Sequence, residues 1–122
     1  MLIARQYGWL NAAVEHADKR TPESRAKQYK DANQPAPLPE LDAGHYFLDM
    51  LMEAGPVKSA PMGGAEGLDW SDIAAYLVEY PVAVDHEERS LLRRMSQAYA
   101  AGLSEGTSPF SISPMDRETS ED

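Results

Sequence analysis

Three prolines stand within five residues at Pro35-Ala36-Pro37-Leu38-Pro39, and this run constrains the fold more than any other feature of the sequence. Proline lacks an amide hydrogen and fixes its own φ, so neither a helix nor a central strand continues through such a run. The run predicts an extended linker over residues 35–40. It divides the chain into a segment of residues 1–34 and a larger remainder.

The two sides of this linker differ in charge. Residues 1–30 carry six basic and three acidic side chains, whereas residues 31–122 carry five basic and 17 acidic ones. Apolar residues recur at helical spacing over residues 2–19, and Thr21-Pro22-Glu23 has the composition of a helix start. We therefore expect residues 1–34 to form a basic helical N-terminal arm. The acidic remainder disfavours nucleic acid as a partner, because phosphates are bound by Lys and Arg.

Residues 41–103 predict a helical core domain. An apolar stripe begins at Leu41, and Gly55-Pro56 ends the helix that carries it. The glycines and prolines of residues 56–67 predict a loop of roughly a dozen residues.

Two capping boxes mark the starts of two further helices in this domain. Asp69 precedes Asp72 by three residues, and Asp85 precedes Glu88 by the same spacing, so each pair can exchange hydrogen bonds with the first turn of a helix. The last of these helices is expected to reach about Leu103.

The composition of residues 104–122, rich in Ser, Thr, Pro and acidic residues, predicts a disordered acidic tail. No stretch alternates apolar and polar residues for long enough to predict a strand. The expected fold class is therefore all-α: a small helical domain of three core helices, with a helical N-terminal arm and a disordered C-terminal tail.

The sequence offers no set of residues for catalysis. The chain has no cysteine, which excludes disulfides and thiol nucleophiles. His45 and Asp49 share a helical face, but two ligands do not make a metal site. The glycine-rich stretch of residues 62–67 lacks the Gly-Lys-Ser/Thr ending of a phosphate-binding loop. We expect neither enzymatic activity nor a cofactor or metal, and no apolar run approaches the roughly 20 residues of a membrane span.

The aromatic residues of the core domain fall into two groups. Trp70 and Tyr99 lie on the apolar stripes of their helices, which favours a role as core anchors. Tyr76 and Tyr80 lie off the main stripe, and we leave open that they belong to an exposed patch that meets a partner.

Residues 38–103 resemble the small tail assembly chaperones of long-tailed phages and prophages. The resemblance rests on Leu38-Pro39-Glu40-Leu41, on Phe47-Leu48, on residues 68–76 and on residues 91–99. The positions that match the two helix motifs of that family are Trp70, Asp72, Ile73, Ala75 and Tyr76 in the first, and Leu92, Met95, Ala98 and Tyr99 in the second.

The resemblance implies a non-enzymatic helper in the cytoplasm of the infected bacterium. Such chaperones bind the tape measure protein, keep it soluble and recruit tail tube subunits, and they are absent from the mature virion. Self-association is left open. The candidate partner-binding residues are Phe47, Trp70, Asp72, Tyr76, Tyr80 and Tyr99.

Two other functions are compatible with an acidic helical chain. One is an acidic phage inhibitor that mimics nucleic acid, which would need carboxylates in regular rows along one face. The other is a minor structural component of the phage tail or head.

Overall fold

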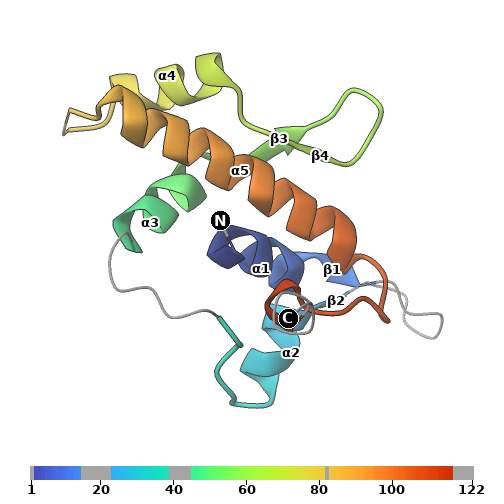
Figure 1. Ribbon diagram of the computed structural model, residues 1–122. Coiled ribbons are helices and arrows are strands. Elements are labelled where there is room, and N and C mark those ends of the chain that lie inside the picture. Colours follow the sequence, from blue (N-terminus) through green and yellow to red (C-terminus); the bar gives the residue numbers. More distant parts are fainter. Residues whose placement is uncertain (1, 15–22, 39–44, 82, 117–122) are drawn as a thin grey trace.

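The computed structural model describes residues 2–14, 23–38, 45–81 and 83–116. Most of these residues are helical, as the sequence predicts (Figure 1). The long helices are α1 (Leu2–Asn11), α2 (Arg25–Asp31), α3 (His45–Ala54), α4 (Trp70–Val78) and α5 (His86–Gly106). Two antiparallel ribbons pair β1 (Ala13–Val14) with β2 (Glu23–Ser24) and β3 (Val57–Ser59) with β4 (Ala65–Gly67). The sequence predicted neither ribbon, because strands of two or three residues are too short to show an alternating pattern.

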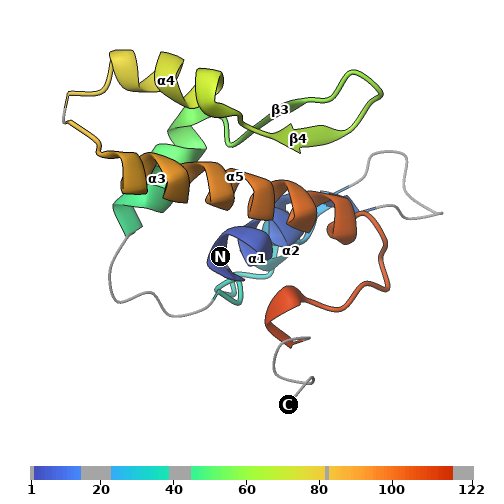
Figure 2. The same ribbon diagram turned by 45° about the horizontal axis from the view of Figure 1, so that its top comes forward.

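Helix α5 is the element around which the others pack. Helices α3 and α4 lie beside its first half and α1 lies along its second half, while the β3–β4 ribbon packs against its middle (Figures 1 and 2). One cluster of buried side chains joins these elements. Its members are Ala4, Leu48, Met50, Leu51, Leu68, Ile73, Leu92, Met95 and Tyr99.

Helices α1 and α5 touch through their backbones. A Cβ atom on Gly8 would lie 2.2 Å from the main-chain oxygen of Tyr99, and one on Gly102 would lie 2.0 Å from that of Arg5. Further along the same contact, Gly106 faces the methyl group of Ala12. Glycine in a helix interior costs about 1 kcal/mol relative to alanine, and here the missing side chains permit the close approach.

The N-terminal segment differs from the arm predicted for residues 1–34. Helix α1 joins the core cluster through Ala4, and its Trp9 and Leu10 are also buried. The helix ends at Asn11, whereas the sequence predicted a helix to residue 19. Residues 15–19 lie outside the described part of the chain. Ala4 and Gly8 lie four residues apart on α1, and these small residues allow the helix to pack closely on α5. The apolar pattern of α1 does not indicate this contact.

The N-cap of helix α2 lies three residues after the cap predicted at Thr21. Ser24 is its N-cap, and the Ser24 hydroxyl accepts a hydrogen bond from the amide of Lys27 at 3.1 Å. Thr21, the predicted cap, lies outside the described residues.

The C-terminal segment also differs from the predicted disordered tail, as far as it is described. Helix α5 continues to Gly106, and Ser113 and Pro114 are buried. The Gln6 side-chain oxygen accepts hydrogen bonds from the Ser113 hydroxyl at 2.9 Å and from the Met115 amide at 3.2 Å. These contacts hold the segment against α1. Residues 117–122 lie outside the described residues.

Buried Arg25 joins α2 to the same segment. Its guanidinium donates to the main-chain oxygens of Gly106, at 2.6 Å, and Ser108, at 2.7 Å. It also lies 4.0 Å from the centre of the Trp9 ring. Burial lowers the pKa of Arg25, and the hydrogen bonds and the ring offset the cost of removing the charge from water.

The segment predicted as a loop over residues 56–67 contains the β3–β4 ribbon. Val57 pairs with Gly67 and Ser59 with Ala65. Ser96 of α5 holds both strands at the open end of the ribbon, since its hydroxyl accepts from the Leu68 amide at 2.7 Å and donates to the Pro56 oxygen at 2.7 Å.

Both predicted capping boxes are confirmed. The Asp69 carboxylate accepts from the Asp72 amide at 3.1 Å, and the Asp72 carboxylate accepts from the Asp69 amide at 3.0 Å. Asp85 and Glu88 exchange the corresponding bonds at 2.9 and 3.3 Å. No helix among the described residues is both long enough and apolar enough to cross a membrane.

Candidate partner-binding surface

Trp70 stands exposed at the first turn of α4. Its indole is stacked on the His86 ring, with 5.7 Å between ring centres and 11° between ring planes, and the Arg93 guanidinium lies 5.3 Å from the indole centre. Trp70 is 44% exposed, so its predicted role as a core anchor is wrong. The buried residue of this short helix is Ile73, three positions after Trp70. We call Trp70, His86 and Arg93 the Trp70 cluster.

A second group lies at the C-terminal end of α4. The Tyr76 and Tyr80 rings are 5.8 Å apart and line a hollow of about 460 Å³. Glu53 from the last turn of α3 and Glu79 from the end of α4 also line it. Burial raises the pKa of Tyr76, and the nearby Glu53 carboxylate raises it further. We call this group the tyrosine hollow; its lining residues are Glu53, Ala75, Tyr76, Glu79, Tyr80 and Pro81.

Phe47 is half-buried against the core, and its ring lies 4.1 Å from that of Tyr46. Tyr46 is 52% exposed, and its hydroxyl donates a hydrogen bond to Glu88 at 3.1 Å. Desolvation and this bond raise the pKa of Tyr46. The exposed aromatic surface of α3 is therefore carried by Tyr46, which is not among the residues predicted from the sequence.

Asp72 has a structural role at the start of α4. The Lys58 ammonium lies 2.8 Å from the Asp69 carboxylate and 2.9 Å from that of Asp72, which ties the β3–β4 ribbon to the start of α4. These hydrogen bonds raise the pKa of Lys58, and the bond from Lys58 is the largest cause that holds the pKa of Asp69 well below its usual range. Both carboxylates are paired with the Lys58 ammonium group. They therefore do not contribute to the row of unpaired carboxylates that a mimic of nucleic acid would need.

Tyr99 is a core residue, 4% exposed, as its stripe position predicts. Its ring lies 6.1 Å from that of Tyr7, and burial, with a smaller contribution from Tyr7, raises its pKa to about 12. Of the six candidate residues, the structure thus brings Tyr76 and Tyr80 together, places Trp70 in a separate exposed cluster, and uses Tyr99 in the core.

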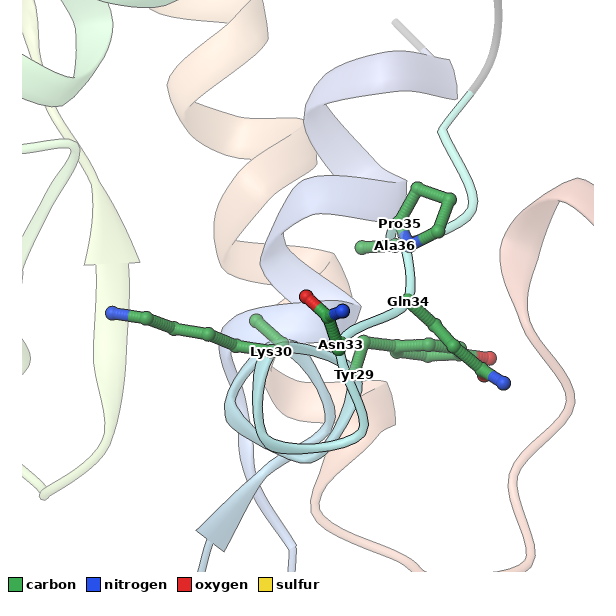
Figure 3. A pocket seen from close by; sticks show the side chains of 7 residues that line it. Tyr29, Lys30, Asn33, Gln34, Pro35 and Ala36 are labelled. Atoms are coloured by element: carbon green, nitrogen blue, oxygen red, sulfur yellow. The ribbon is translucent and has the colours of Figure 1, made fainter.

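A further hollow, of about 430 Å³, lies between α2 and the proline run. Figure 3 shows Tyr29 and Gln34 extending to one side of it while Lys30 extends to the other. Asn33, at the turn, has a φ of 57°. Because the polar side chains diverge, this hollow presents no convergent binding group.

Sequence reasoning missed the acidic residues of the tyrosine hollow. Glu53 and Glu79 stand at the ends of α3 and α4, and neither helix has a basic residue in its last turn. That placement opposes the helix dipole, which favours cations at a C-terminus. An acidic residue at a helix C-terminus is therefore the sequence feature that could have pointed to these two glutamates. Trp9 and Arg25 were missed as well, because their contact joins residues far apart in the sequence.

Among the described residues, no group of three or more His, Asp or Glu side chains is placed to hold a metal ion. The side chain of His45 lies outside the described part, so the predicted face shared with Asp49 is not described. No protein family, curated protein or solved structure matches this chain.

Proposed function

We propose that this chain is a non-enzymatic tail assembly chaperone of a long-tailed phage. In this role it binds the tape measure protein in the cytoplasm of the infected cell, keeps it soluble and helps to recruit tail tube subunits. It is not retained in the mature virion. The proposal starts from the resemblance of residues 38–103 to this class of proteins.

The observation that carries the proposal is the exposure of Trp70. Four other residues of the two matched motifs, Ile73, Leu92, Met95 and Tyr99, are buried and account for the fold. Trp70 is 44% exposed within the same motif. Exposed tryptophan is enriched where proteins bind one another, because its large ring buries much apolar area at little cost in conformational entropy.

The charge of the chain supports the same role. The formal net charge of −9 at pH 7 favours solubility of the chaperone while its aromatic groups contact an aggregation-prone client. Charge also favours rapid and reversible association with a client segment of opposite sign.

Co-expression with the tape measure protein encoded in the same genome tests the proposal. We expect the soluble fraction of the tape measure protein to rise with the wild-type chain. The gain should be largely lost with Trp70→Ala and kept with Phe110→Ala, which removes an aromatic ring that is 91% exposed elsewhere. An unchanged soluble fraction with the wild-type chain would overturn the proposal.

Mass spectrometry of purified virions separates the chaperone from a structural component. A chaperone is present in the lysate of infected cells and absent from the particles. Recovery of the chain in stoichiometric amounts from virions would instead establish a structural role.

A further inference from the structure

We propose that the tyrosine hollow is a binding site for an arginine side chain of a partner protein. The proposal specifies which side chain of the client protein this surface binds. It rests on the proposed function only for the identity of the client. It places the guanidinium against Tyr76 and Tyr80 and between the carboxylates of Glu53 and Glu79.

The geometry of the hollow suits a planar cation. The two tyrosine rings are 5.8 Å apart with 38° between their planes, and both residues line the hollow. The hollow of about 460 Å³ has room for a guanidinium and part of its aliphatic stem. A guanidinium stacks its plane on aromatic faces and donates to carboxylates in a fixed fork, whereas an ammonium group has no planar fork of donors.

The electrostatics of the hollow select a cation. Glu53 comes from the last turn of α3 and Glu79 is the C-cap of α4, so two carboxylates from separate elements line one space. The carbonyl groups at the end of α4 add partial negative charge. No ion pair joins either glutamate to a basic side chain within the described residues.

Two glutamates at helix C-termini are unfavourable for the isolated fold, because each opposes a helix dipole. A guanidinium bound between them removes this repulsion. The Glu53 carboxylate lies close enough to Tyr76 to add to burial in raising the pKa of the Tyr76 hydroxyl. A neutral side chain lacks this Coulomb attraction, and an anionic side chain is repelled by the two carboxylates.

The binding test is an NMR titration of the full ¹⁵N-labelled chain with N-acetyl-arginine amide. N-acetyl-citrulline amide, which has the same shape and no charge, is the matched ligand. With the arginine compound, we expect saturable chemical-shift changes at the amides of Glu53 and of residues 75–80. The citrulline compound should bind with about tenfold lower affinity. Equal binding of the two compounds, or shifts confined to other regions, would overturn the proposal.

Paired variants separate this site from the overall negative charge. Glu53→Gln with Glu79→Gln should weaken arginine binding about tenfold, since two charge-assisted contacts to a partly exposed group are lost. Glu87→Gln with Asp116→Asn makes the same change in net charge at two exposed positions and should leave the affinity unchanged. The spectra of the unliganded variants verify that both remain folded. An equal loss in the two double variants contradicts a specific site.

The two proposals fail separately. Arginine binding in the hollow without any gain in tape measure solubility refutes the chaperone function and leaves the site intact. A chaperone gain without arginine binding refutes the site alone.

Discussion

The main-chain oxygen of Arg5 faces Gly102 so closely that a Cβ atom on Gly102 would lie 2.0 Å from it. No ordinary contact of a Cβ atom is that short, so the crossing of α1 and α5 requires glycine at this position. The adjacent Arg5 and Glu105 side chains form an ion pair across the same crossing, at 2.5 Å. The N-terminal helix is therefore held to the longest helix of the fold by backbone contact.

Gly102→Ala should destabilise the chain by about 3 kcal/mol, because the added methyl group forces the two helix backbones apart. Urea unfolding followed by circular dichroism measures this loss. Ala101→Ser, which adds one atom on the exposed side of the same helical turn, should change stability by less than about 0.5 kcal/mol. A loss below about 1 kcal/mol in Gly102→Ala would mean that the helices do not touch in this way.

Arg25→Lys should cost about 2 kcal/mol and loosen residues 107–116. Lysine keeps the charge but cannot bond to the Gly106 and Ser108 oxygens together while it lies over Trp9. Hydrogen exchange followed by mass spectrometry should show faster exchange in this segment. Arg94→Lys, at an exposed position of α5, is the control and should leave exchange unchanged.

Tyr99→Phe should remove part of the loss of stability at alkaline pH. Since burial raises the pKa of Tyr99 to about 12 from 10.0, its contribution is complete below pH 10 and is lost as the pH rises from 10 to 12. Between pH 8 and pH 11 the wild-type chain should lose about 1 kcal/mol more than the variant. Urea unfolding at the two pH values measures the difference, and parallel losses in both proteins would contradict it.

Lys58→Met should make the stability less sensitive to acid. Lys58 lowers the pKa of Asp69 below its ordinary value of 3.8, so the contribution of this pair is present above pH 4 and declines as the pH falls further. The variant should be less stable than the wild-type chain at pH 6 and should approach it at pH 2.5. Lys30→Met removes an exposed lysine of α2 and serves as the charge-matched control, for which a constant difference is expected.

Trp70→Ala and Ile73→Ala should differ in their effect on stability, although the two residues share one helix. Ile73 is 2% exposed, and its truncation leaves a cavity that costs about 3 kcal/mol. Replacement of the exposed Trp70 should lower the free energy of unfolding by less than about 1 kcal/mol, so this substitution should affect binding and not folding. Thermal unfolding of the two variants distinguishes them, and a large destabilisation by Trp70→Ala would assign that residue to the core.

The candidate site was only partly predictable. Tyr76 and Tyr80 could be selected because they lie off the apolar stripe of α4. Glu53 could not be joined to them from the sequence, since more than 20 residues separate it from Tyr76 and only the packing of both α3 and α4 against α5 brings them to one hollow.

The sequence by itself determined where helices α4 and α5 begin. Asp69 with Asp72 and Asp85 with Glu88 satisfy amide groups within four residues, and such short-range hydrogen bonds are encoded locally. The tertiary structure decided the burial of those side chains for which the local pattern indicated the opposite. Trp70 has the spacing of a core residue and is exposed, whereas Arg25 lies in a polar helix and is buried, because burial depends on distant partners such as Gly106 that no local pattern specifies.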